Sequence, residues 1–101
     1  MQVMRKPYII SDQALKDIDE IIENVIEFTS YTASGIKLYN EIFETLELIS
    51  LLPKAGRMRQ ENNALREMFA RSYRIVYQEF DDVILIITVI HSRRLYPQPI
   101  N

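Results

Sequence analysis

The hydrophobic pattern of the chain changes its period at Pro53, and this change limits the folds that the chain can adopt. Before Pro53, apolar residues recur at helical spacing over two long stretches with charged residues opposite, which predicts two amphipathic helices. The second stretch ends near Leu52, because a proline disfavours helical geometry at the residue before it. After Pro53, short apolar runs rich in β-branched and aromatic residues predict strands. The order of these patterns predicts an α+β fold.

Each predicted helix has a start signal and an apolar stripe. Ser11 and Asp12 offer N-cap oxygens to the first helix, and Thr32 offers one to the second. The first stripe contains Leu15, Ile18, Ile22 and Val25, and the second contains Tyr39, Ile42, Phe43, Leu46 and Ile49. Because the connection at residues 29–32 is short, we expect the two helices to form an antiparallel hairpin.

Four short runs predict the strands of one sheet. Residues 8–10 form a run before the helices, and residues 65–69, 73–79 and 83–90 follow a turn at residues 53–57. The last run lacks polar alternation, which indicates a strand inside the sheet with both faces partly covered. We expect a single domain over residues 1–101, in which the helical hairpin packs on one face of a mainly antiparallel sheet in the order β-α-α-β-β-β.

The composition excludes several kinds of chemistry. The chain has no cysteine, one histidine and only two glycines. These counts rule out disulfides, thiolate or multi-histidine metal sites and a glycine-rich phosphate loop, so we expect neither a metal nor a cofactor. The N-terminus shows no signal-peptide pattern, and the longest largely apolar run, residues 83–90, is too short to cross a bilayer. We therefore expect a cytoplasmic protein with no membrane partner.

The charge of the chain is unevenly distributed, although its formal net charge is only −2. Residues 1–52 carry nine acidic and four basic side chains, a charge of −5, and residues 53–101 carry five acidic and eight basic ones, a charge of +3. Eight of the twelve basic residues are arginines, whose guanidinium groups bind carboxylates and phosphates in a bidentate way. The asymmetry indicates either a partner that recognises charge or a set of arginines that solvates one side of the sheet.

Candidate contact residues gather near the C-terminus. His91 ends the last predicted strand just before Arg93 and Arg94, where it is suited either to proton transfer or phosphate contact, or to a hydrogen bond within the fold. Tyr96 lies in the tail and is free to stack on a base. The tyrosines of the strand at residues 73–79 alternate along it, which favours packing within the sheet over base stacking.

Five phrases, in this order, resemble those of the ParE/RelE toxins of bacterial type II toxin–antitoxin modules. They are residues 14–21 (ALKDIDEI), 43–46 (FETL), 53–57 (PKAGR), 73–77 (YRIVY) and 89–94 (VIHSRR). The resemblance spans nearly the whole chain. It implies a toxin that inhibits growth and that a small antitoxin neutralises, with the C-terminal segment of the antitoxin covering apolar and basic surface of the toxin.

Two branches of this superfamily differ in activity. The resemblance implies inhibition of DNA gyrase by binding for a ParE-like chain, and ribosome-dependent cleavage of mRNA for a RelE-like chain. The ending at residues 91–94 is similar to that of ParE-like chains. Glu67 and Met68 stand where nuclease members often carry a catalytic arginine, and the chain is poor in the lysines that such members commonly use along the RNA path. The resemblance therefore favours a gyrase inhibitor that is not an enzyme.

The site residues implied by the resemblance depend on the branch. Those for binding the target or the antitoxin are Arg57, Arg59, Arg66, Arg74, His91, Arg93, Arg94 and Tyr96. Under the nuclease alternative, the catalytic residues are Arg71, Arg74, His91 and Tyr96. A degenerate toxin without activity is the third alternative. The expected partners are a cognate antitoxin, in a hetero-oligomer, and DNA gyrase, with the ribosome and its mRNA as the alternative target.

Overall fold

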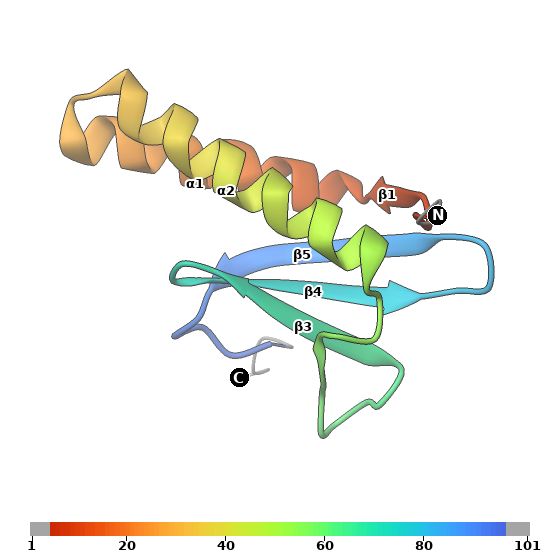
Figure 1. Cartoon of the computed structure of the whole chain (residues 1–101). Helices are drawn as coiled ribbons and strands as arrows, with labels where there is room; N and C mark the ends of the chain where they lie inside the picture. Colours follow the sequence, from red (N-terminus) through yellow and green to blue (C-terminus); the bar gives the residue numbers. More distant parts are fainter. Residues whose placement is uncertain (1–4, 97–101) are drawn as a thin grey trace.

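The computed structural model describes residues 5–96, where two helices cover one face of a five-stranded sheet (Figure 1). The elements in chain order are β1 (Tyr8–Ile10), α1 (Asp12–Thr29), α2 (Thr32–Leu51), β2 (Arg57–Met58), β3 (Leu65–Ala70), β4 (Tyr73–Glu79) and β5 (Ile84–His91). The order of the strands in the sheet is β1-β5-β4-β3-β2. β1 runs parallel to β5, and the other neighbouring pairs are antiparallel. The predicted α+β class, helical hairpin and mainly antiparallel sheet are confirmed.

The start of α1 is fixed by its N-cap residue. The Ser11 hydroxyl accepts a hydrogen bond from the Ala14 N–H at 3.0 Å, as predicted, and donates one to the carbonyl of Ile87 in β5 at 2.7 Å. At the other end of α1, Ser30 adopts a left-handed conformation with φ 62°, and its N–H bonds to the carbonyl of Ile26. The chain then reverses into α2.

The predicted cap of α2 is wrong by one residue. Thr32 is already the first helical residue, and Tyr31 stands at the N-cap position without a side-chain hydrogen bond. The Tyr31 N–H bonds instead to the hydroxyl of Thr29 at 3.2 Å, so the threonine at the end of α1 organises the connection. The two helices pack closely beside this connection, because a Cβ atom on Gly35 of α2 would lie only 2.5 Å from the side chain of Ile26 in α1.

The hydrophobic core lies between the helices and the sheet. α1 contributes Ala14 and Ile18, α2 contributes Leu38, Ile42, Leu46 and Ile49, and the strands contribute Ala70, Ile75, Tyr77, Ile84, Ile86 and Val89. Each large aliphatic side chain buried in this way contributes about 1.5–3 kcal/mol to stability. The predicted stripe of α2 is confirmed at Ile42, Leu46 and Ile49, whereas Tyr39 is 45% exposed and stacks on Phe43 at the helix surface.

A β-bulge in β5 fastens α1 to the sheet. The register between β4 and β5 shifts at Val76 and Tyr77, so that Ile87 has no direct partner. Asp17 of α1 reaches this irregular segment, where its carboxylate accepts hydrogen bonds from the Thr88 hydroxyl at 2.5 Å and the Val89 N–H at 3.1 Å. The bulge thus fixes the position of α1 on β5, which lies inside the sheet as predicted.

The two-residue strand β2 is not predicted by the sequence pattern, because it is too short to show an alternation. It pairs with β3, with Arg57 opposite Glu67 and Met58 opposite Arg66. This pairing brings Arg57 and Arg59 beside Glu67 of β3, next to the edge of the sheet that β2 forms. Within residues 5–96, neither helix is long and apolar enough to cross a membrane.

Candidate functional site

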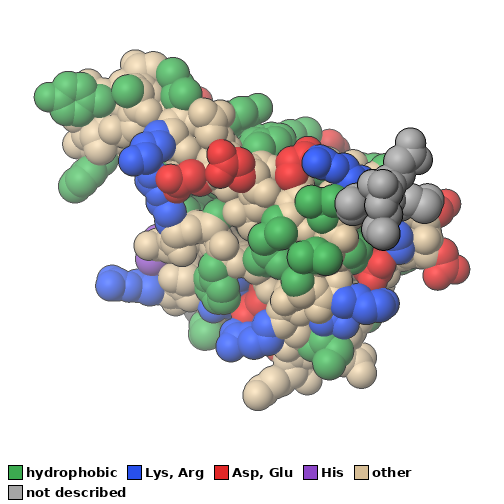
Figure 2. Space-filling model, in the orientation of Figure 1, with side chains coloured by type: hydrophobic (Ala, Val, Ile, Leu, Met, Phe, Trp, Pro, Cys, Tyr) green, Lys and Arg blue, Asp and Glu red, His purple; other side chains and the backbone are tan. Residues whose placement is uncertain are grey.

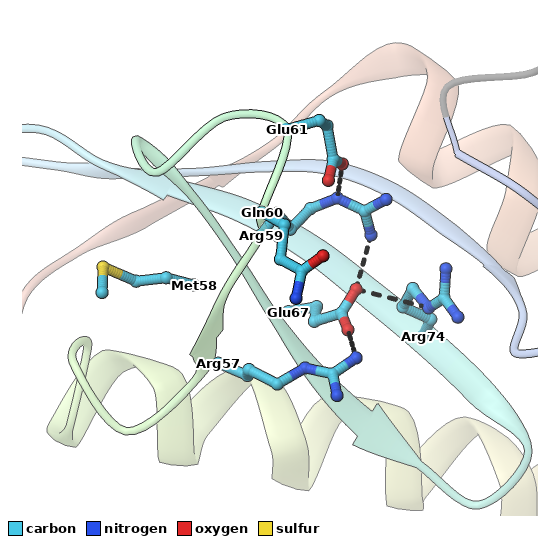
Figure 3. A pocket seen from close by; sticks show the side chains of 7 residues that line it. All are labelled: Arg57, Met58, Arg59, Gln60, Glu61, Glu67 and Arg74. Carbon is cyan, nitrogen blue, oxygen red and sulfur yellow. Dashed lines mark hydrogen bonds and ion pairs between the residues drawn. The ribbon is translucent and has the colours of Figure 1, made fainter.

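A buried carboxylate, Glu67, lies among three arginines on the face of the sheet that the helices leave open (Figure 3). The neighbours of Glu67 in β3, Met68 and Ala70, pack against the core, and alternation along the strand directs Glu67 to the opposite face. One carboxylate oxygen pairs with Arg57 of β2. The other pairs with Arg59 and lies 3.4 Å from the Nε atom of Arg74 in β4.

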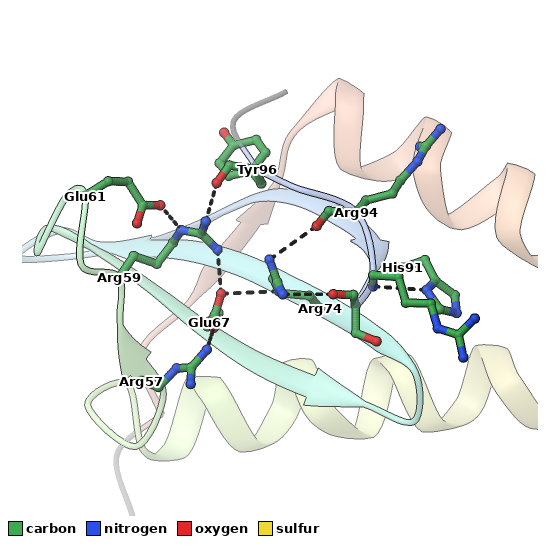
Figure 4. Close-up of polar contacts among 10 residues, drawn as sticks. Arg57, Arg59, Glu61, Glu67, Arg74, His91, Arg94 and Tyr96 are labelled. Atoms are coloured by element: carbon green, nitrogen blue, oxygen red, sulfur yellow. Dashed lines mark hydrogen bonds and ion pairs between the residues drawn. The ribbon is translucent and has the colours of Figure 1, made fainter. Parts of the chain in front are cut away.

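Arg59 is held on several sides. Its side chain is only 8% exposed, and its guanidinium contacts the carboxylates of Glu67 and Glu61 and the backbone carbonyl of Tyr96 (Figure 4). The ring of Tyr96 lies over the same guanidinium, with its centroid 5.4 Å from the central carbon. Arg59 therefore links the loop after β2, strand β3 and the C-terminal segment.

Arg74 ties the C-terminal segment to the same site. Its guanidinium donates to the carbonyls of Ser92 at 2.9 Å and Arg94 at 3.4 Å, and it lies 5.8 Å from the ring centroid of Phe69. Its Nε atom is buried without a hydrogen bond, although it lies within ion-pair distance of Glu67. The arginine therefore works as a structural link between β4 and the chain that follows β5.

These residues line a cavity of about 500 Å³. Its wall is made by Arg57, Met58, Arg59, Gln60, Glu61, Glu67 and Arg74. The three arginines and two glutamates sum to a charge of +1. The pKa of Glu61 is lowered, first by a hydrogen bond to the backbone N–H of the same residue and then by the contact with Arg59. Both carboxylates occupy arginine donors of this cluster. Within residues 5–96, no group of acidic or histidine side chains could hold a metal ion.

His91 belongs to a different place. Its ring packs edge-on against Tyr73, with centroids 5.7 Å apart, and its Nδ1 atom accepts a hydrogen bond from the Arg93 N–H at 3.2 Å. Together with Arg94 it borders a cleft of about 310 Å³ against α1, where Asp17, Glu20 and Asn24 form the opposite wall. The His91 side chain therefore faces an acidic helix and lies apart from the arginines around Glu67.

The remaining predicted site residues are dispersed. Arg66 donates to the carbonyls of Lys54 and Gly56, and Arg71, in a left-handed conformation between β3 and β4, pairs with Glu41 of α2. Arg93 is exposed. The structure thus brings Arg57, Arg59, Arg74 and Tyr96 together and places the other predicted residues elsewhere.

Sequence reasoning missed the role of Glu67 as the centre of the cluster. A signal was available, since Glu67 is an acidic residue within a predicted strand that follows the arginine-rich turn. The contact itself depends on the pairing of β2 with β3, which places Arg57 opposite Glu67. The tyrosine at position 77 is fully buried, in agreement with the expected packing role. Its burial raises the pKa of the phenol.

A helical hairpin on one face of a mainly antiparallel sheet is the fold that this chain shares with solved toxins of the ParE/RelE superfamily. Within this superfamily, residues 8–96 match the family described as the ParE toxin of the type II toxin–antitoxin system parDE, and the chain belongs to that family. Comparison with curated protein sequences gives no significant match.

Solved structures share the fold at low sequence identity. A chain of the chromosomal ParDE system from P. aeruginosa superposes with a TM-score of 0.73 at 15% identity, covering 89% of this chain and 98% of that one. A chain of the RelBE2 toxin–antitoxin complex from Mycobacterium tuberculosis gives 0.65 at 16% identity, covering 86% and 98%. A free E. coli RelE carrying two arginine-to-alanine substitutions gives 0.65 at 21% identity, covering 89% and 86%.

Proposed function

We propose that this chain, the toxin of a type II toxin–antitoxin system, arrests growth by binding DNA gyrase and does not cleave mRNA. The ParE family match and the ending at residues 91–94 favour the gyrase branch. The observation that carries the proposal is the placement of Glu67. Its carboxylate is 3% exposed and occupies Arg57, Arg59 and Arg74, the cations that an RNA backbone would need on this face.

The candidate residues for RNA cleavage do not converge on one point. Arg71 pairs with Glu41 of α2, and Arg74 is held by backbone carbonyls after β5. His91 faces α1, whereas Tyr96 lies over Arg59 on the other side of the sheet. General acid–base cleavage needs a base and an acid within hydrogen-bond reach of one phosphodiester. The dispersal favours a protein that acts by binding.

A cognate antitoxin is the second partner in this proposal. The open face of the sheet carries a net positive cluster beside Phe69, whose side chain is 46% exposed. An acidic amphipathic segment suits such a surface, because its carboxylates pair with arginines while its apolar side chains cover the exposed ones. The proposed complex is a hetero-oligomer that hides this face until the antitoxin is removed.

The test compares two activities of the purified protein. We expect it to inhibit supercoiling of plasmid DNA by gyrase and to leave translated mRNA intact on purified ribosomes. Addition of the protein encoded next to it, if that protein is the antitoxin, should restore supercoiling at a stoichiometric ratio. Cleavage of ribosome-bound mRNA at defined codon positions, without an effect on gyrase, would overturn the proposal.

A further inference from the structure

The end of the helical hairpin carries exposed apolar side chains where no part of the sheet covers it. The last turns of α1 and the first turns of α2 project past the end of β5 (Figure 1), and hydrophobic side chains are grouped at this projecting end (Figure 2). Phe28 is 91% exposed, Tyr31 70% and Ile36 57%. These are three of the five most exposed large apolar residues in the described part of the chain.

The hairpin tip, defined here as residues 27–36, is held in shape by its own contacts. Gly35 is buried against Ile22 and Ile26, so the two helices approach closely just before the chain reverses. The Thr29 hydroxyl donates to the carbonyl of Val25 at 2.9 Å and accepts from the Tyr31 N–H at 3.2 Å. The exposed aromatic rings are therefore presented by a preorganised turn, and little backbone conformational entropy remains to be lost when a partner covers them.

The charge beside the tip indicates the chemistry of its partner. Residues 17–27 of α1 contain five carboxylates, Asp17, Asp19, Glu20, Glu23 and Glu27, and there is no basic residue between Lys16 and Lys37. A second copy of the chain docked tip to tip would bring these acidic helices together, which disfavours such a dimer. A groove with an apolar floor and basic rims complements both properties of the tip.

We propose that the hairpin tip is the surface that docks the toxin's target, in an apolar groove on the target rimmed by lysine or arginine side chains. Phe28 and Tyr31 fill the groove, since aromatic side chains bury about 150–250 Å² each and dominate interface energies. Glu23 and Glu27 lie against its basic rim. This inference rests on the proposed function in that it assigns a surface to target binding. It also separates that surface from the arginine cluster around Glu67, which suits an acidic antitoxin segment.

The experiment uses the full chain with two exposed aromatic residues replaced, Phe28→Ser together with Tyr31→Ser. The matched control is Leu15→Ser, a 46% exposed apolar residue near the other end of α1. Each protein is induced without antitoxin to score growth arrest, then purified to measure gyrase inhibition and binding of the antitoxin. Thermal unfolding verifies that both variants fold as the wild type does, as expected for substitutions of exposed side chains.

We expect the double variant to lose growth arrest and to need at least tenfold more protein for gyrase inhibition, while antitoxin affinity stays within twofold of the wild type. Leu15→Ser should keep all three properties. A second variant, Glu23→Lys with Glu27→Lys, should weaken target inhibition more at low salt than at high salt.

Two outcomes would overturn the docking surface: a double variant that remains as toxic as the wild type, or one that loses antitoxin binding and keeps its toxicity. Failure of the gyrase proposal looks different. The wild type then arrests growth without affecting supercoiling, and loss of arrest in the double variant would still support the tip as the docking surface for another target. A wild type without any toxicity would overturn both proposals.

Discussion

Arg59 and Glu67 form an ion pair in which the arginine side chain is 8% exposed and the glutamate side chain 3%. A pair so deeply buried contributes little net stability when it is intact, because desolvation of the two charges offsets their attraction. Removal of one partner is different, since the other charge is then left buried without compensation. The cluster around Glu67 therefore fixes the geometry of the open face more than it strengthens the fold.

The first prediction concerns Glu67. Replacement Glu67→Gln removes the charge that holds Arg57, Arg59 and Arg74, and we expect unfolding to become easier by about 3 kcal/mol. The matched control is Glu61→Gln, whose carboxylate touches the same Arg59 but is 44% exposed, and whose loss should destabilise the fold far less because solvent screens the pair. Urea denaturation of the three proteins measures the difference. Equal stability of both variants would contradict the prediction.

A second prediction follows from the charge of the cavity. Glu67→Gln raises the sum of its charges from +1 to +2, and it frees arginine donors that the carboxylate now occupies. We expect the variant to bind single-stranded RNA more tightly than the wild type, with a steeper dependence on salt. Fluorescence polarisation at several salt concentrations measures both quantities. An unchanged affinity would show that Glu67 does not restrain phosphate binding.

A third prediction concerns the turn at residues 53–57. The hydroxyl of Tyr77 donates to the carbonyl of Pro53 at 2.7 Å and accepts from the N–H of Gly56 at 3.1 Å. A Cβ atom on Gly56 would lie 2.2 Å from that hydroxyl oxygen. We expect Tyr77→Phe to cost about 1–3 kcal/mol, because the buried N–H of Gly56 and the half-buried carbonyl of Pro53 lose their partner, and we expect Gly56→Ala to destabilise the fold as well. In Tyr77→Phe the hydroxyl is absent, so the added cost of Gly56→Ala should shrink, which a double-mutant cycle would reveal.

The role of this turn shows how far sequence reasoning extends. The phrase at residues 53–57 served as a marker of the family, but only the structure explains its glycine, through contact with a tyrosine twenty-one positions later. Helices and long strands were predictable because their periodicity is local. The strand β2, the cap at Tyr31 and the cluster around Glu67 were not, because each depends on a contact that a two-residue segment or a single side chain makes with a distant part of the chain.

A fourth prediction concerns acid stability. Hydrogen bonding with Lys6, at 2.6 Å, lowers the pKa of Glu79 from its ordinary value of 4.5, and Lys54 adds to the effect. A carboxyl group with a lowered pKa in the folded state stabilises the protein above about pH 4.5, and this contribution is lost as the pH falls through the folded-state pKa. We expect Glu79→Gln to be less stable than the wild type at pH 7. Below pH 4 the difference in unfolding free energy between the two proteins should become smaller. Urea unfolding at both pH values measures the difference, and a difference that stays constant would contradict the assignment.

The fifth prediction concerns Arg93 and Arg94, which are exposed at the end of β5. The contacts of this segment with Arg74 use the backbone carbonyls of Ser92 and Arg94, so reversal of the side-chain charges leaves them in place. We expect Arg93→Glu with Arg94→Glu to fold as the wild type does and to weaken toxicity or antitoxin binding. The core variant Leu46→Asp, at a fully buried position, should by contrast abolish soluble protein. Because we propose that arginines bind the antitoxin and that the hairpin tip docks the target, the charge reversal should lower antitoxin affinity more than gyrase inhibition. The opposite ranking, measured on one protein preparation, would place target recognition at the arginine-rich end of the sheet.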